Sequence, residues 1–147
     1  MVSFVGGLTL SGGLTLQAPG SVLRIVGGAV GENSYEGAAY VYNIDGTNQV
    51  KITPGTGGSS LYFGTSVASS GSKIAVGSDR YNSYDGRVYV YDNDGTNEVT
   101  IDPTAGYAGT GGEEFGYSLA MNSSKLAVGS PGDHHSSTVT QSGALYI

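Results

Sequence analysis

Cysteine and tryptophan are absent from this chain of 147 residues, and charged residues make up only 12% of it. Without cysteine the chain can form neither disulfides nor thiolate metal sites, and its redox compartment stays undetermined. Only six residues are basic, they are scattered, and the formal net charge is −6. A phosphate-binding surface needs clustered Lys and Arg, so nucleic acid is excluded as a partner.

Long apolar runs are also missing. None approaches the roughly 20 residues that cross a bilayer, so we expect no membrane insertion. Residues 1–16 have no basic start, and two Gly-Gly pairs interrupt their apolar stretch, which argues against a secretory signal. The remainder is rich in Tyr, Ser, Thr and Gly, as extracellular surfaces are. We therefore expect a location outside the cell, reached either after removal of a signal or by lysis.

What the chain does contain is glycine (26 residues) and tyrosine (11 residues) in a length that suits one domain. Together with Ser, Thr and Val, these residues favour short strands and tight turns over helices. The sequence predicts an all-β protein.

A segment of about 50 residues recurs about three times, with 62–103 as its fullest copy. Phe63 corresponds to Phe115 at a shift of 52, and Lys73 to Arg24 at a shift of 49. The third copy carries a five-residue insertion around 133–142 and stops early. In the first copy, 14–19 replace the opening of the repeat. Recurrence at this period indicates a repeat architecture.

Each copy contains four strand candidates, which in the second copy are 63–68, 73–78, 87–91 and 98–101. They alternate or carry short β-branched runs, bounded by Gly, Ser, Asn and Asp. Asp94-Gly95 joins the last two, and Asp-Gly is a strong hairpin signal because glycine readily adopts positive φ. Four antiparallel strands per period describe a blade of a β-propeller.

The segments FGTSVA, KIAVGS and GRVYVY, with FGYSLA, KLAVGSPGD and GALYI, resemble FG-GAP repeats, the blades of integrin-type β-propellers. The resemblance implies a β-propeller-type array of four-stranded antiparallel FG-GAP-like blades in about three copies, the last incomplete. The blades span roughly 14–61, 62–113 and 114–147, within a repeat region of 21–147. The YVYxxDGTNxVxI variant also resembles repeat proteins of tailed bacteriophages of marine bacteria, cyanobacteria included, which occur in tail, fibre and other virion proteins.

The repeat pattern predicts a core. Phe63 and Phe115 are expected to pack between neighbouring blades, while Gly64 and Gly116 let strands approach closely. The innermost buried layer is expected to contain Ile74, Val76, Leu126 and Val128.

Three copies are too few for a closed propeller, which has about four to eight blades. Three arrangements remain open: the chain is part of a longer protein, several chains combine into an oligomeric ring, or the first residues supply a missing outer strand. Residues 1–20 form either an extended N-terminal arm that anchors to a neighbouring subunit or the first strand of the fold.

Sites of chemistry are few. Integrin-type blades often hold calcium between their first two strands, but here the equivalent loops lack carboxylates, so the family's calcium loop is missing and we expect no cofactor or metal. Asp92 and Asp94 superficially resemble calcium ligands, but the hairpin explains them. His134 and His135 fit a solvated loop. Glu113 and Glu114, neighbours before a strand, fit a solvated charge pair better than a catalytic one.

Two equivalent loops, GENSYEG (31–37) and RYNSYDG (80–86), share Asn-Ser-Tyr-acid-Gly. Tyrosine with Ser, Gly and Asn is typical of adaptable recognition surfaces, and aromatic faces stack on sugar rings. Tyr107 adds a further ring. The alternative is that the loop tyrosines only cover the blade beneath. The candidate ligand-binding residues are Tyr35, Tyr81, Tyr84, Asn33 and Asn82.

We therefore expect a non-enzymatic structural and binding component of a bacteriophage virion, such as a tail fibre, neck fibre or decoration protein. Its partners are expected to be other virion subunits and a host-surface glycan or protein, and we expect an oligomer. The alternative is a secreted or surface-attached bacterial adhesin with integrin-like repeats.

Overall fold

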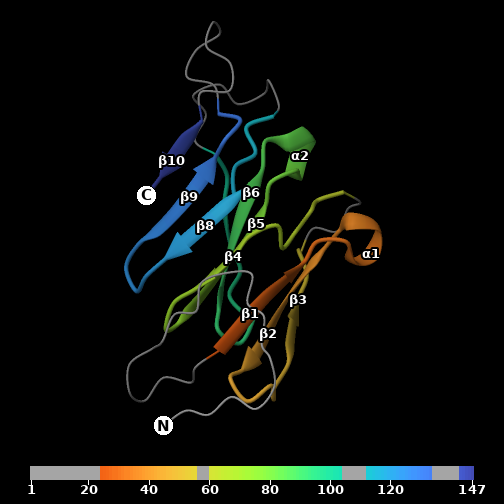
Figure 1. Ribbon diagram of the computed structural model, residues 1–147, viewed down its shortest axis with the longest axis vertical. Helices are drawn as coiled ribbons and strands as arrows, with labels where there is room; N and C mark the ends of the chain where they lie inside the picture. Colours follow the sequence, from red (N-terminus) through yellow and green to blue (C-terminus); the bar gives the residue numbers. More distant parts are fainter. Residues whose placement is uncertain (1–23, 56–59, 104–111, 134–142) are drawn as a thin grey trace, which may run out of the picture.

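The chain forms a row of antiparallel sheets connected in sequence order (Figure 1). The computed structural model describes residues 24–55, 60–103, 112–133 and 143–147. The first sheet contains β1 (Arg24–Ala29), β2 (Ala38–Asn43) and β3 (Val50–Ile52). The second contains β4 (Val67–Ser69), β5 (Lys73–Ser78), β6 (Arg87–Asp92) and β7 (Val99–Ile101). The third contains β8 (Ser118–Met121), β9 (Leu126–Ser130) and β10 (Ala144–Tyr146).

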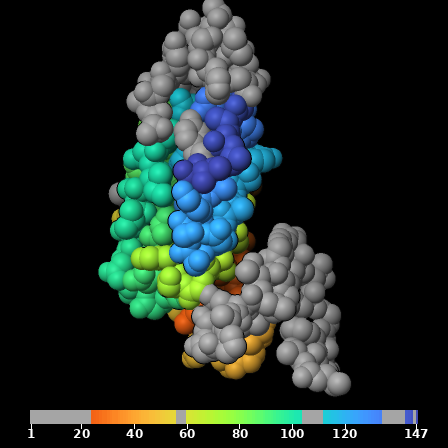
Figure 2. All heavy atoms as spheres, turned by 90° about the vertical axis from the view of Figure 1, so that its left-hand side faces the viewer, coloured from red at the N-terminus to blue at the C-terminus, as the bar shows by residue number. Residues whose placement is uncertain are grey.

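Among the described residues, the four strands expected in each repeat are found only in the second sheet. Within the described ranges the first and third sheets have three strands each, and the sheets follow one another without closing into a ring (Figures 1 and 2). Three sheets cannot surround an axis, which is why this part of the chain is an open row. The first strand expected at 14–19 and the arm expected at 1–20 lie outside the described residues.

The Asp-Gly hairpin prediction is confirmed. β6 and β7 pair antiparallel, and the turn between them is closed by Asp92 N–H donating to Thr96 O (2.9 Å) and Gly95 N–H donating to Asp92 O (2.9 Å). Gly95 has φ +81°, a conformation that glycine adopts without steric cost. The turn at 43–47, between β2 and β3, repeats both bonds.

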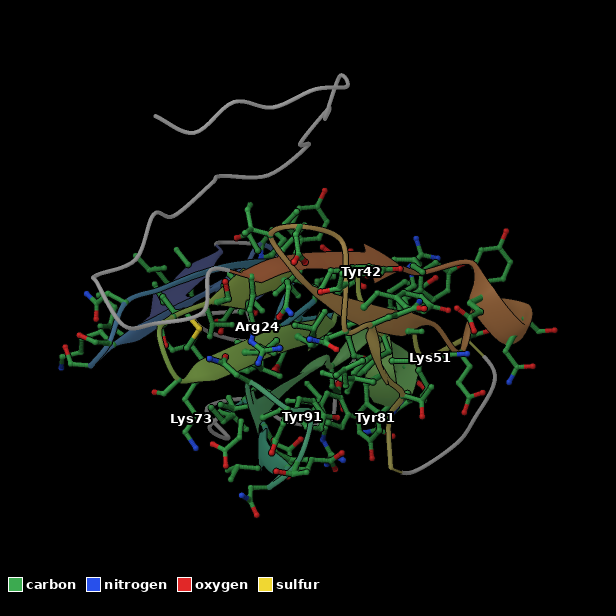
Figure 3. The ribbon with its side chains drawn as sticks, turned by 90° about the horizontal axis from the view of Figure 1, so that it is seen from below. Arg24, Tyr42, Lys51, Lys73, Tyr81 and Tyr91 are labelled. Carbon is green, nitrogen blue, oxygen red and sulfur yellow. The ribbon has the colours of Figure 1, made fainter. Side chains whose placement is uncertain are left out.

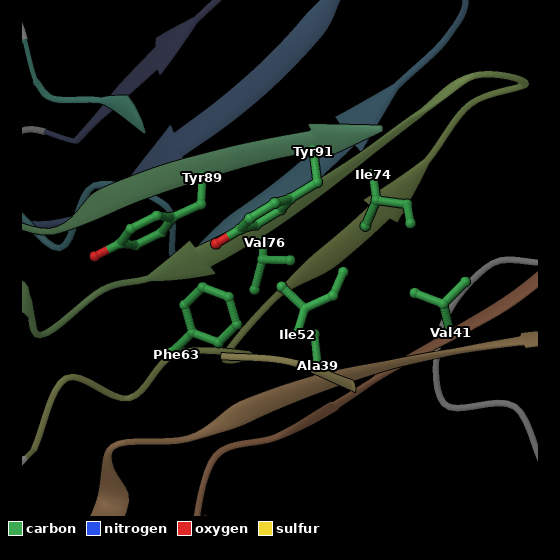
Figure 4. Close-up of a cluster of buried hydrophobic side chains, with 8 residues drawn as sticks. All are labelled: Ala39, Val41, Ile52, Phe63, Ile74, Val76, Tyr89 and Tyr91. Atoms are coloured by element: carbon green, nitrogen blue, oxygen red, sulfur yellow. The ribbon is translucent and has the colours of Figure 1, made fainter. Parts of the chain in front are cut away.

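Phe63 lies between the first and second sheets and is fully buried (Figure 4). The first sheet contributes Ala39, Val41 and Ile52 to its surroundings, and the second contributes Ile74, Val76, Tyr89 and Tyr91. Phe63 makes edge-to-face contacts with both of these tyrosines, at 5.1 and 6.4 Å between ring centroids. Such contacts add to the stabilisation that burial alone provides.

Phe115 repeats this position one sheet further along. It is 2% exposed and packs with Ala75 and Val88 of the second sheet and Val128 of the third. The prediction that both phenylalanines pack between neighbouring sheets is confirmed. Ile74, Val76 and Val128 are buried as expected. Leu126 is only partly buried, because it opens β9 at the border of this cluster.

The Phe-Gly pair does not open a strand, contrary to the expectation. β4 begins at Val67, and Phe63 instead forms an isolated parallel bridge with Gly37 of the preceding repeat. The reason is Gly64, whose φ of +93° is incompatible with a strand. A Cβ built on Gly28 would lie 1.9 Å from Gly64 O, so the predicted close approach at Gly64 is confirmed.

The buried rings should dominate stability. We predict that Phe63→Ala and Phe115→Ala each lower the free energy of unfolding by about 3–5 kcal/mol, because each change leaves a cavity between two sheets. Urea denaturation followed by circular dichroism measures the change.

Tyr117→Ala is the matched control. Tyr117 is 53% exposed and lies two residues from Phe115, so its truncation should change stability by no more than about 0.5 kcal/mol. Equal losses for Phe115→Ala and Tyr117→Ala would contradict the packing described.

Candidate functional site

The two Asn-Ser-Tyr loops are left-handed turns at the same end of neighbouring sheets. They correspond to α1 (Glu32–Tyr35) and α2 (Tyr81–Tyr84), on the right-hand side of Figure 1. In α2, φ is 49° at Asn82, 62° at Ser83 and 72° at Tyr84, and the equivalent residues of α1 have the same sign. Three consecutive non-glycine residues with positive φ are costly, roughly 1–2 kcal/mol each for a left-handed conformation.

Hydrogen bonds within each loop hold this conformation. Asn82 Nδ2 donates to Asp85 Oδ2 at 2.6 Å, and Gly86 N–H donates to Tyr81 O at 3.0 Å. In the first loop, Asn33 donates to Glu36, and Gly37 N–H closes the same ring. Asparagine suits the first left-handed position because its short amide bonds locally.

The loop carbonyls bind the following repeat. Tyr35 O accepts from Tyr62 N–H at 2.9 Å, and Glu36 O accepts from Phe63 N–H at 3.1 Å. One repeat later, Tyr84 O accepts from Glu114 N–H at 2.7 Å, and Asp85 O accepts from Phe115 N–H at 3.1 Å. Each loop therefore binds the Phe-Gly segment of the next repeat through backbone hydrogen bonds. These bonds offset the cost of the left-handed backbone in the loop.

Between the first and second sheets, this docking assembles a stack of aromatic rings around one cation. Tyr35 stacks on Tyr62 with ring centroids 5.1 Å apart and an interplanar angle of 19°. The Arg80 guanidinium lies 4.0 Å from the Tyr62 ring centroid and 5.1 Å from that of Tyr84. Tyr35 and Tyr84 remain 51% and 44% exposed, so the stack presents its outer rings to solvent.

A pocket of about 320 Å³ lies against this stack. Residues 60–62, 80 and 82–84 line it. These side chains supply hydroxyl groups, one amide, a guanidinium and two phenol rings, and none of them is a carboxylate or an imidazole. The lining therefore suits stacking and hydrogen bonding.

Arg80 has no carboxylate partner among the described residues. Its one hydrogen bond is the 3.5 Å contact from Nη1 to the Tyr84 hydroxyl oxygen. Lys51, Lys73 and Arg87, by contrast, each pair with an acidic side chain. The positive charge in the pocket lining is thus not neutralised locally by the described part of the chain.

Tyr81 faces a different environment. The Arg87 guanidinium lies 4.0 Å from the Tyr81 ring centroid and binds Asp102 through two bonds, of 2.5 and 2.8 Å. The bonds to Asp102 raise the pKa of Arg87 above its usual value. This bidentate pair shows how a tyrosine-stacked guanidinium in this protein uses its remaining N–H groups.

The first loop carries different side chains at two of these positions. Glu32 stands where the second loop has Tyr81, and it accepts from Lys51 and from the Tyr40 hydroxyl, which hold the pKa of Glu32 below its usual value. Gly31 stands where the second loop has Arg80. In the view from below, Lys51 lies close to α1, and Lys73 lies towards the opposite end of the molecule (Figure 3).

The structure brings three of the five candidate ligand-binding residues together. Tyr35 and Tyr84 belong to the stack, and Asn82 lines the pocket. Tyr81 and Asn33 are not part of that lining. The sequence analysis did not predict Tyr62 or Arg80 as site residues. Arg80 is the first residue of the 80–86 loop, and Tyr62 directly precedes Phe63. The contact between them depends on a turn that the repeat pattern does not reveal.

The other candidate residues have structural roles or lie outside the described ranges. Asp92 bonds Lys73 and Asn97, and Asp94 bonds Thr96, so both carboxylates serve the hairpin. Glu113 is only 5% exposed, which corrects the expected solvated pair: its carbonyl accepts from Ser130 Oγ and Gly132 N–H, which draw it into the third sheet. His134, His135 and Tyr107 lie outside the described residues.

The described ranges contain neither a metal-binding cluster nor a membrane-spanning helix. They contain no group of three or more His, Asp or Glu arranged to hold a metal ion. No helix there combines the length and apolar character that spanning a bilayer requires.

Comparison with known proteins finds a similarity for one segment of the chain. Residues 47–91 match the model of the FG-GAP repeat. The match runs from the first Asp-Gly hairpin through β6, and so includes Phe63 and the whole pocket lining. The matched segment lies within an all-β fold of antiparallel sheets. No curated protein matches the chain.

The left-handed loops generate a prediction. We expect Asn33→Ala and Asn82→Ala each to lower the free energy of unfolding by about 1–2 kcal/mol, because alanine is strained at positive φ and lacks the amide bond. Thermal or urea denaturation measures the loss. Asn82→Gly is the control: glycine accepts this φ, so its loss should be smaller. If the Ala and Gly variants were equally destabilised, backbone strain would not govern these loops.

Proposed function

We propose that this chain is a non-enzymatic structural and binding component of a bacteriophage virion. In this proposal the loop end of the sheets contacts a host-surface glycan or protein, or neighbouring virion subunits. The observation that carries the binding role is the stack of Tyr35, Tyr62, Arg80 and Tyr84, with exposed outer rings beside a pocket.

The chemistry of the lining favours recognition over catalysis. Tyrosine supplies a large, rigid contact area at low cost in conformational entropy, and serine and asparagine supply adaptable hydrogen bonds. General acid–base catalysis most often uses His, Asp or Glu, and the pocket lining has none of these. The left-handed loop fixes Asn82 and Tyr84 before a ligand arrives, which reduces the entropic cost of binding.

The virion setting rests on the resemblance of the YVYxxDGTNxVxI segments to phage repeat proteins. The FG-GAP match at 47–91 is compatible with a second candidate, a bacterial adhesin with integrin-like repeats. Mass spectrometry of purified particles from the source separates the two. Peptides of this chain co-purifying with capsid and tail proteins support the virion setting, and their recovery from bacterial surface fractions alone supports the adhesin.

The binding role is tested on a glycan array. We expect the labelled protein to bind a restricted set of saccharides, and Tyr84→Ala to weaken that binding about tenfold or more, because a ring that stacks on the ligand is lost. Tyr117→Ala, which removes an equally exposed tyrosine outside the pocket lining, should bind as the wild type does. Equal effects of the two substitutions, or no binding at all, would contradict a glycan-binding role for this pocket.

A further inference from the structure

We infer that the pocket beside Arg80 binds acidic saccharides, and that the Arg80 guanidinium receives the carboxylate of the sugar. This inference rests on the proposed function, for which it names the ligand class. It follows from the hydrogen-bonding capacity of Arg80, from a second arginine in the same fold, and from the composition of the pocket.

The Arg80 guanidinium lies close to two aromatic rings but makes few hydrogen bonds. Its carbon lies 4.0 Å from the Tyr62 ring centroid and 5.1 Å from that of Tyr84, within the range of cation–π contacts. Its five N–H groups point outward in the plane of the group. Among the described residues only the Tyr84 hydroxyl accepts from them, at 3.5 Å. The aromatic contacts therefore hold Arg80 in place, while most of its donors have no acceptor among the described residues.

Arg87 shows what a stacked guanidinium binds in this protein. Its distance to the Tyr81 ring, 4.0 Å, equals that of Arg80 to Tyr62. Arg87 uses its edge for a two-bond contact with the Asp102 carboxylate. No described carboxylate pairs with Arg80 in this way. A planar carboxylate fits such an edge better than a hydroxyl does, because both partners present two parallel bonding positions.

Two acidic residues flank the pocket-lining segments in the sequence, and neither pairs with Arg80. Asp79 is buried and accepts from Thr65 Oγ1 at 2.6 Å. Asp85 accepts from the Asn82 amide through Oδ2 at 2.6 Å, while its Oδ1 is buried and has no hydrogen-bond partner among the described residues. Neither lies within ion-pair distance of Arg80. The net charge of −6 gives no long-range attraction for an anion. Affinity for an anion would therefore come from this local contact.

The rest of the pocket fits a sugar. Its volume of about 320 Å³ lies at the lower end of the range for small-ligand sites, which suits one or two sugar units. The exposed Tyr84 ring offers a face for stacking, and Ser60 and Ser83 offer hydroxyl groups at the rim. A ligand whose carboxylate binds the Arg80 guanidinium and whose sugar ring stacks on Tyr84 is a uronic acid or another sugar acid.

The test compares acids with their own esters. Short saccharides carrying glucuronate, galacturonate or sialate are titrated into the ¹⁵N-labelled protein, each beside its methyl ester, which keeps the rings but removes the charge. We expect at least one acid to bind roughly tenfold to hundredfold more tightly than its ester, as the loss of a hydrogen bond to a charged group implies. The Arg80 Nε–H signal should shift with the acid and not with the ester.

Two variants with the same net charge provide the control. Arg80→Gln should abolish the preference for the acid. Lys125→Gln, which removes an exposed charge immediately before β9, should keep it. Arg80→Lys keeps the charge but loses the planar edge, and should retain only part of the preference. Chemical shifts of the remaining amides verify that each variant is folded.

The outcomes separate the two proposals. Equal binding of acids and esters, equal effects of Arg80→Gln and Lys125→Gln, or an array that retains neutral saccharides alone would overturn the inference and leave glycan binding intact. An array that retains no saccharide would overturn glycan binding itself.

Discussion

Burial of one phenylalanine between two consecutive sheets is the interaction on which the rest of this structure depends. Phe63 joins the first sheet to the second, and Phe115 joins the second to the third. A single sheet cannot bury its own apolar face. Each sheet therefore forms a core by packing against the phenylalanine ring at the start of the next repeat. The same packing requires glycine at positions 28 and 77. A side chain at Gly28 or Gly77 would collide with the backbone of the Phe-Gly segment that packs there.

The left-handed loops are the polar counterpart of this packing. The left-handed backbone of these loops is unfavourable in isolation. Their carbonyls, however, accept hydrogen bonds from the N–H groups of Phe63 and Phe115, which lie outside the strands. The loop of one repeat and the Phe-Gly segment of the next therefore form one structural unit. The pocket lies beside this junction: residues 60–62, 80 and 82–84 line it, and the first loop adds the Tyr35 ring that stacks on Tyr62. It carries a cation and paired rings between the first and second sheets, where Tyr62 and Arg80 meet, whereas the next junction has Glu114 and Gly132 at these positions.

Periodicity in the sequence was enough to predict the elements whose cause is local. The 73–78 and 87–91 segments form β5 and β6, and the Asp-Gly pairs form the hairpins, because alternation and turn chemistry act within a few residues. The burial of Phe63 and Phe115 followed from their recurrence. Gly64 interrupting the first strand, the three positive φ values at 82–84 and the burial of Glu113 were not predicted. The left-handed turn at 82–84 and the position of the Phe-Gly segment are fixed by backbone bonds between repeats, and Glu113 is held by Ser130 Oγ and Gly132 N–H. The contact between Tyr62 and Arg80 follows from the same docking.

Hydrogen exchange at the amides of Phe63 and Phe115 tests most directly whether repeats are joined through these segments. Both amides lie outside the strands and donate to carbonyls of the preceding loop. If the junctions are as stable as the sheets, both amides exchange as slowly as those of Ile74 and Val76 in β5, through unfolding of the whole unit. Exchange as fast as that of exposed turn amides without a hydrogen-bond acceptor would show that the repeats are not held together in this way, and would contradict the account.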